Sequence, residues 1–165
     1  MTPKRSPDQR SREEDEAMRV DVSTSLDCSA EKAWGEVQTS ALLLRVIWPL
    51  ARIVPVGAPS FPERWREGET VLCSSFIFGF IPIGVRTLYF KRIDEAAGVR
   101  ETRESDPLVK RWDHRVTIRP DGDDRSVYRD EIEIDAGPWT FLVWAWASWF
   151  YRHRQARLRK ITKTL

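Results

Sequence analysis

Cysteine, long apolar runs and net charge are all scarce in this sequence, and each scarcity excludes a class of protein. The two cysteines, Cys28 and Cys73, lack the close spacing of metal-binding and disulfide-rich proteins, so we expect reduced thiols and no metal site. The net charge is only +2, from 27 basic and 25 acidic residues, which argues against a nucleic-acid-binding protein. The longest mostly apolar stretch, residues 139–151, is too short to cross a bilayer, which takes about 20 residues.

Sequence motifs of the common enzyme classes are absent as well. The chain has no GxSxG motif, no glycine-rich phosphate loop and no HExxH motif. Four glycines in the strand-rich part of the chain stand alone, and single glycines in strands typically mark bulges. We therefore expect no cofactor, and the sequence favours a binding protein over an enzyme.

The first 17 residues differ in character from the rest of the chain. They are rich in charge and lack the apolar stretch of a secretory signal, which predicts a disordered leader and a cytoplasmic protein. Residues 18–165 have about the length of one domain, so we expect a single hydrophobic core.

The ordered chain is predicted to begin with one strand and two short helices. The segment MRVDVSTSL, Met18–Leu26, alternates apolar and polar residues as a half-buried strand does. Ser29 then predicts an N-cap, because an apolar stripe at helical spacing follows it. A second apolar cluster, residues 41–50, is ended by Pro49. Both helical segments are too short to be stable alone and must pack on something else.

Turn signals divide the chain between Arg52 and Asp135 into closely spaced strands with no helices between them. This spacing predicts five or six strands in an antiparallel meander. The clearest strands are residues 71–80, 85–93, 99–104, 110–119 and 125–135. One segment, residues 100–104, alternates charges and has no apolar face, which predicts an exposed or edge strand.

A long helix is predicted at the C-terminal end. It begins at the Gly137-Pro138 step and continues to about Lys163. Its first half is rich in tryptophan and apolar on nearly every side, whereas its second half is basic. A helix of this kind needs a curved sheet to lie in, so the sequence predicts an α+β fold with an antiparallel sheet wrapped around this helix.

This order of elements resembles the helix-grip fold of the START-like (SRPBCC) superfamily. That superfamily includes the polyketide cyclase/dehydrase and lipid-transport family and relatives of the birch-pollen allergen. The resemblance is carried by VDVSTSLDCSAEKAWGEV near the start, by WDHRVTI, and by YRDEIEIDAGPWTFLVWAWASWFYRHRQARLRKI at the end, a stretch that also resembles small uncharacterised bacterial members. It implies a cavity between sheet and C-terminal helix that holds a lipid, sterol, polyketide or aromatic molecule.

Candidate ligand-binding residues follow from the alternation of two neighbouring strands and the period of the last helix. The strands place a mostly apolar set with a few polar members on one face, which is typical of a small-molecule pocket. These strand candidates are Trp112, His114, Val116, Tyr128, Asp130 and Ile132. Spacing of three and four residues along the helix adds Phe141, Trp144, Ala145 and Ser148.

His114 is the sharpest single candidate, because it is one of two histidines and shares its strand face with Trp112. A neutral imidazole could orient a carbonyl or hydroxyl group of a ligand, or move a proton near neutral pH. The alternative is a core histidine hydrogen-bonded to Asp130 or Tyr128.

Three functions therefore stay open. The favoured one is binding of a small hydrophobic molecule without catalysis. The second is a cyclase, dehydratase or hydrolase in which His114 acts with Asp130 or Tyr128. The third is a module that contacts a membrane surface or another protein through the Trp-rich, basic C-terminal helix. Exposed tryptophans would also admit a homodimer beside the monomer.

Overall fold

The computed structural model describes residues 17–164, so the predicted leader, apart from Ala17, lies outside the described residues. The strands are β1 Met18–Leu26, β2 Ala51–Pro55, β3 Thr70–Ile77, β4 Ile81–Asp94, β5 Val99–Ser105, β6 Arg111–Pro120 and β7 Ser126–Asp135. The helices are α2 Ala30–Val37, α3 Ser40–Ile47, the short 3-10 helix η1 Gly137–Trp139, and α4 Thr140–Thr162.

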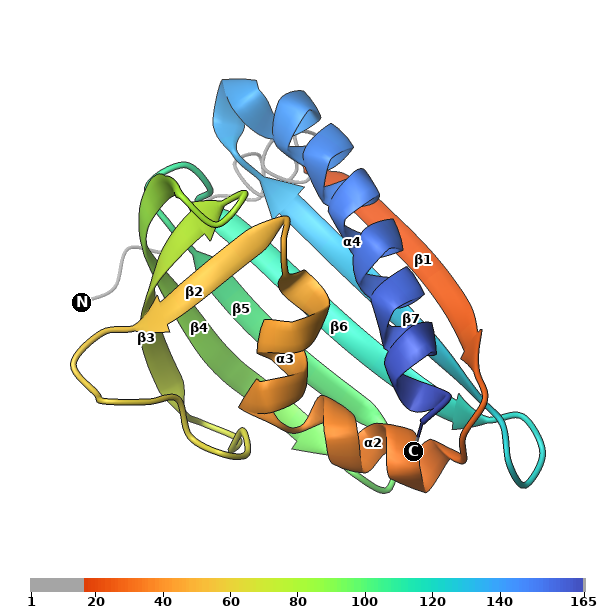
Figure 1. The fold of residues 1–165 in the computed structure, drawn as a ribbon. Helices are drawn as coiled ribbons and strands as arrows, with labels where there is room; N and C mark the ends of the chain where they lie inside the picture. Colours follow the sequence, from red (N-terminus) through yellow and green to blue (C-terminus); the bar gives the residue numbers. More distant parts are fainter. Residues whose placement is uncertain (1–16, 165) are drawn as a thin grey trace, which may run out of the picture.

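The seven strands of the described chain form one antiparallel sheet in the order β1-β7-β6-β5-β4-β3-β2. The sheet curls, and α4 lies across its concave side, next to β1 and β7 (Figure 1). Helices α2 and α3 pack against the same side near the C-terminal end of α4 (Figure 1). This is the helix-grip arrangement, and the predicted α+β fold is confirmed.

Local sequence signals explain the first elements. β1 alternates as expected, with Val20, Thr24 and Leu26 buried and Asp21, Ser23 and Ser25 exposed. The side chain of Ser29 accepts a hydrogen bond from the backbone N–H of Lys32 and so caps α2. Thr39 caps α3 in the same way. The two short helices are thus where the sequence places them, and both bury an apolar face.

The prediction that residues 100–104 form an exposed or edge strand is wrong. They belong to β5, which is the middle strand of the sheet, between β6 and β4. Arg100 and Thr102 are buried, and Glu104 is mostly covered. Their polar side chains alternate on the concave side, where they meet other polar groups. The edge opposite β1 is instead β2, a strand beyond the five clearest ones predicted.

Strand β4 is bent at two bulges. Its pairing with β3 skips Ile83, and its pairing with β5 skips Lys91, so each of these residues is extra relative to the neighbouring strand. A bulge bends its strand and increases the local twist. The two bulges thus help to bring the β2–β4 part of the sheet forward and around the helices (Figure 1).

The core lies between α4, the two short helices and the concave side of the sheet. Its largest fully buried side chains include Tyr128, Leu26 and Ile132. A second cluster around Trp65 and Phe90 continues under β3 and β4. Both cysteines are buried and free, and within residues 17–164 no helix is long and apolar enough to span a bilayer.

Candidate ligand-binding site

A cavity of about 370 Å³ lies between the sheet, α3 and α4. Its volume falls at the lower end of the range for small-molecule sites, ~300–1,000 Å³. Its wall is mainly apolar, with side chains from α3, β2, β3, β4 and α4. Representative members are Leu43, Ile53, Phe76, Leu88 and Val143.

Aromatic rings form two opposite parts of this wall. Trp65 stacks on Phe90 with ring centres 4.8 Å apart, on the side of the curled sheet. Trp146 stacks on Phe150 at the same distance, on α4. A ligand in the cavity therefore meets flat, rigid surfaces from both sides.

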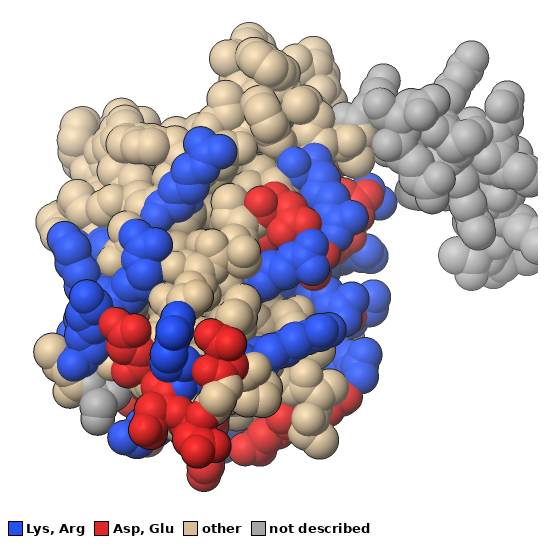
Figure 2. Space-filling model, turned by 90° about the vertical axis from the view of Figure 1, so that its right-hand side faces the viewer, with Lys and Arg blue, Asp and Glu red and all other residues tan. Residues whose placement is uncertain are grey.

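The cavity reaches the surface near the start of α4. Trp139, Leu142 and Leu108 line the cavity, yet each is more than 40% exposed. The neighbouring β3–β4 turn contributes Phe78, whose ring contacts that of Trp149 on α4, with centres 6.3 Å apart. Figure 2 shows that the end of the molecule where α4 begins carries almost no charged side chains. Five residues at this end form what we call the apolar rim: Phe78, Leu108, Trp139, Leu142 and Trp149.

His114 and Asp130 form the centre of a buried polar network. The Nε2 atom of His114 lies 2.7 Å from Oδ1 of Asp130. The hydroxyl of Tyr128 donates to the same oxygen at 2.8 Å, and Gln155 donates to Oδ2 at 3.0 Å. All four side chains are buried, and the network joins β6, β7 and α4.

The protonation states of this network follow from its surroundings. Burial lowers the pKa of His114 more than the nearby carboxylate raises it, so the imidazole is neutral near pH 7. Burial alone would raise the pKa of Asp130, but the hydrogen bond from His114 and the charge of Arg154 bring it below its ordinary value. A carboxylate accepts only, so Nε2 of His114 carries the proton and Nδ1 has the free lone pair.

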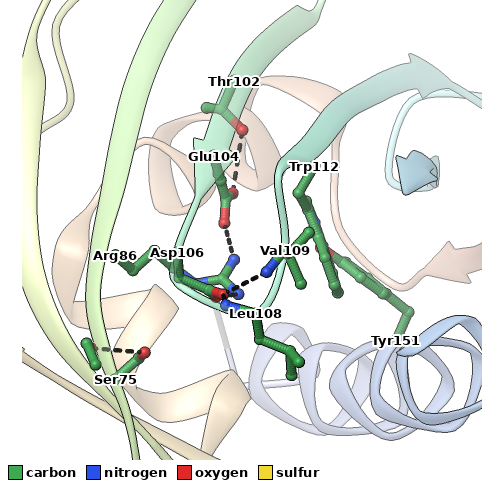
Figure 3. Close-up of polar contacts among 10 residues, drawn as sticks. Ser75, Arg86, Thr102, Glu104, Asp106, Leu108, Val109, Trp112 and Tyr151 are labelled. Carbon is green, nitrogen blue, oxygen red and sulfur yellow. Dashed lines mark hydrogen bonds and ion pairs between the residues drawn. The ribbon is translucent and has the colours of Figure 1, made fainter. Parts of the chain in front are cut away.

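A second polar group surrounds Arg86 (Figure 3). Its guanidinium donates to Glu104 at 2.8 Å and to Asp106 at 2.5 Å. Asp106 also accepts from the backbone N–H groups of Leu108 and Val109, which fixes the turn between β5 and β6. The guanidinium lies 5.2 Å from the ring centre of Trp112, which places it against the cavity wall. Arg86 is therefore held by two carboxylates and an aromatic face.

Two further arginines line the cavity near its inner end. Arg100 donates from Nη1 to the carbonyl oxygen of Val37 at 2.6 Å. Arg154 lies with its guanidinium 5.3 Å from the ring centre of Tyr151. Burial, reinforced by the charge of Arg154, lowers the pKa of Arg100. Within residues 17–164 no cluster of three or more His, Cys, Asp or Glu could hold a metal ion.

The structure places the strand candidates on one concave face but only partly in the cavity wall. Trp112 and His114 line the cavity. The remaining four are buried in the core beside it and are not lining residues: Val116, Tyr128, Asp130 and Ile132. Tyr128 and Asp130 thus reach the cavity only through their hydrogen bonds to lining residues or to each other.

The helix candidates do not line the cavity and lie on other faces of α4. Trp144 donates from its indole to the carbonyl oxygen of Arg19 at the far edge of the sheet, and Ser148 bonds back to Trp144. Phe141 and Ala145 are exposed. The sequence predicted the wrong face of α4 for the cavity. Because the first half of this helix is apolar on every side, residue spacing alone does not show which side meets the sheet.

Sequence reasoning missed the charged part of the wall. Five charged residues line the cavity although the sequence analysis did not name them as ligand-binding candidates: Arg86, Arg100, Glu104, Asp106 and Arg154. One usable signal was the alternation of Arg100, Thr102 and Glu104. A second was the four-residue spacing of Trp146, Phe150 and Arg154, which all line the cavity.

Comparisons with known proteins agree with this architecture. Residues 24–162 match the family model described as "Domain of unknown function (DUF8410)". No curated protein matches the chain. An aromatase/cyclase, Zhui from Streptomyces sp. R1128, is similar with TM-score 0.69 and 10% identity, covering 89% of this chain and 94% of that one. Norcoclaurine synthase from Thalictrum flavum, solved with dopamine and hydroxybenzaldehyde, has TM-score 0.65 and 12% identity, covering 99% and 95%. Ara h 8.0201 has TM-score 0.64 and 11% identity, covering 90% and 99%.

Proposed function

Because this chain belongs to the DUF8410 family and has the START-like helix-grip fold, we propose that it binds one small apolar molecule in the cavity beneath α4. The observation that carries this proposal is the apolar, aromatic-walled space of about 370 Å³. Protein interiors are close-packed, with few voids larger than a water molecule. A space of this size inside a core is therefore better explained by an occupant than by packing.

The polar groups of the wall would orient that molecule. Nδ1 of His114 is not used by Asp130 and can accept a hydrogen bond from a hydroxyl or amide of the ligand. The flat rings of Trp65 and Trp146 favour a planar or extended apolar body. The aromatic molecules in the norcoclaurine synthase structure are of this general type.

Ligand capture tests the proposal. The protein is purified and examined by native mass spectrometry, and any bound molecule is extracted and identified. Val143→Trp should fill the cavity and abolish binding, since Val143 lines it. Ala145→Trp is the matched control on the exposed side of α4 and should bind as the wild type does. Absence of any co-purifying or added ligand from a lipid and aromatic panel would refute the proposal.

A second candidate, acid-base catalysis on the bound molecule, is favoured by the buried hydrogen bond between His114 and Asp130. The carboxylate orients the imidazole through Nε2 and leaves Nδ1 free to act as a base, on a residue that lines the cavity. Asp130 and Tyr128 do not line the cavity, so in a cyclase, dehydratase or hydrolase they would position His114 and not touch the substrate. His114→Gln should then stop conversion of an identified ligand while the ligand still binds. Unchanged conversion would exclude this candidate.

The apolar rim supports a third candidate, contact with a lipid surface during ligand entry. The rim includes Leu142 and Trp149 from the Trp-rich half of α4. In the basic half, two arginines are held by the protein itself: Arg157 donates to the carbonyl oxygen of Arg45 and Arg159 to the hydroxyl of Thr24. Contact would therefore depend on apolar side chains and be insensitive to salt. Co-sedimentation with phosphatidylcholine vesicles tests it, with Trp139→Ser as the variant. A mass that doubles with concentration and no vesicle binding would indicate a homodimer instead.

A further inference from the structure

Two arginines line the cavity without forming an ion pair to any carboxylate of residues 17–164. Arg100 is 5% exposed and Arg154 is 8% exposed, and both line the cavity. They also border a second, much smaller cavity, which places them next to each other. Burying a guanidinium costs free energy unless hydrogen-bond acceptors or an anion replace its water.

The described chain satisfies these two groups only in part. Among residues 17–164, Arg154 makes no hydrogen bond and no ion pair, and the ring of Tyr151 is the group its charge rests against. Arg100 makes one hydrogen bond, to Val37, and its buried Nε has no partner there. Most of their donors are therefore free to bind something inside the cavity.

The nearby carboxylates are already in use. Asp130 accepts hydrogen bonds from three side chains, those of His114, Tyr128 and Gln155. Glu104 accepts from Arg86 and from Thr102. Two guanidinium groups and the single carboxylate of Asp130 leave one positive charge at the inner end of the cavity. The group around Arg86, with its two carboxylates, leaves one negative charge farther along the wall.

We propose that Arg154, together with Arg100, binds the carboxylate of an apolar carboxylic acid held in the cavity. A guanidinium fork fits a carboxylate in a bidentate manner, and a monoanion matches the single excess positive charge. The net negative charge of Arg86 with Glu104 and Asp106 disfavours an acid group beside them, so the ligand is bound with its carboxylate at Arg100 and Arg154. This inference rests on the proposed binding function and names its ligand class.

Matched acid and alcohol probes test the inference separately from ligand binding itself. Dodecanoic acid is compared with dodecanol, and naphthoic acid with naphthylmethanol, by titration calorimetry or by quenching of the lining tryptophans at neutral pH. Since hydrogen bonds to charged groups are stronger than those between neutral groups, we expect each acid to bind at least about tenfold more tightly than its alcohol. Arg154→Met should remove this preference and leave the Kd for the alcohol nearly unchanged.

Controls separate specific recognition from general charge. Arg152→Met removes an exposed arginine of the same helix and should keep the preference for the acid. Arg100→Met provides a second variant that should weaken the preference should Arg154→Met fail to fold. An acid and alcohol of equal affinity in the wild type would overturn the inference while sustaining the proposed function. Failure of all four probes to bind would overturn both.

Discussion

The side chains of His114 and Asp130 meet diagonally across β6 and β7, with 2.7 Å between Nε2 and Oδ1, although their backbone partners are Ile132 and Val116. The diagonal contact leaves the Asp130 carboxylate within reach of two more donors, from its own strand and from α4. One carboxylate thus ties two central strands to the helix.

Removing the charge of Asp130 should therefore destabilise the fold. Asp130→Asn replaces one acceptor oxygen by a donor in a site with three donors, so we expect a loss of about 3 kcal/mol or more in the free energy of unfolding. Urea denaturation measures it. Asp113→Asn is the control, because its partner Arg103 is exposed and such pairs contribute about 0–1 kcal/mol. Equal losses in the two variants would contradict a structural role for the network.

Stability should fall as the pH drops below the ordinary pKa of histidine, 6.5. Burial lowers the pKa of His114, so in this range the unfolded chain binds a proton that the folded chain does not. His114→Gln should flatten the dependence of unfolding free energy on pH between about pH 7 and about pH 5, and an unchanged dependence in this variant would contradict the prediction. The lowered pKa of Asp130 adds a loss of the same sign at lower pH, below 3.8.

Replacing Arg86 should lower the stability of the fold far more than replacing an exposed arginine of the same sheet. Arg86→Met leaves Glu104 and Asp106 facing each other without their cation, and breaking a buried pair costs about 3–5 kcal/mol. Thermal unfolding compares it with Arg103→Met, which removes an exposed ion pair. Similar unfolding temperatures for both variants would show that the Arg86 group is well solvated.

Adding a side chain at Gly98 should destabilise the fold more than adding one at Gly122. A Cβ at this position would lie 2.3 Å from the carbonyl oxygen of Ile118, and its φ of +61° is in the left-handed region. Gly122 has a φ of +88° but open space around it, so Gly122→Ala reports the backbone strain alone, about 1–2 kcal/mol. Gly98→Ala should cost a further ~1–3 kcal/mol, measured by urea denaturation, because the backbone must also move. Equal costs would mean that the contact relaxes freely.

The fold could be predicted because its signals are local. Alternation in Met18–Leu26, the cap at Ser29 and the Gly137-Pro138 step each depend on neighbours in the chain, and the structure places an element boundary at or near each. The resemblance of the element order then supplied the tertiary arrangement.

The site was less accessible because it depends on distant contacts. Arg100 looks like a surface residue by composition, and only the Val37 carbonyl and the cavity show why it is buried. Tertiary contacts with the curled sheet determine which side of α4 faces the cavity. The sequence of a helix that is apolar on all sides does not show which side that is. Trp112 and His114 were found because alternation in a regular strand survives without tertiary information.

Each of the two extra residues of β4 shifts by one the residue numbers that face the concave side of the sheet. The residue that faces inward has an odd number at Ile83. The inward-facing residues then have even numbers, at Arg86, Leu88 and Phe90, and an odd number again at Ile93. Deleting Lys91 would leave Phe90, Arg92 and Ile93 in regular alternation opposite Thr102, Glu101 and Arg100, so the inner and outer faces of β4 would be kept. The strand would lose the bend and added twist of the bulge, and with them part of the curl that closes the sheet over the cavity. The shape of the cavity wall thus depends on a residue that pairs with nothing in β5.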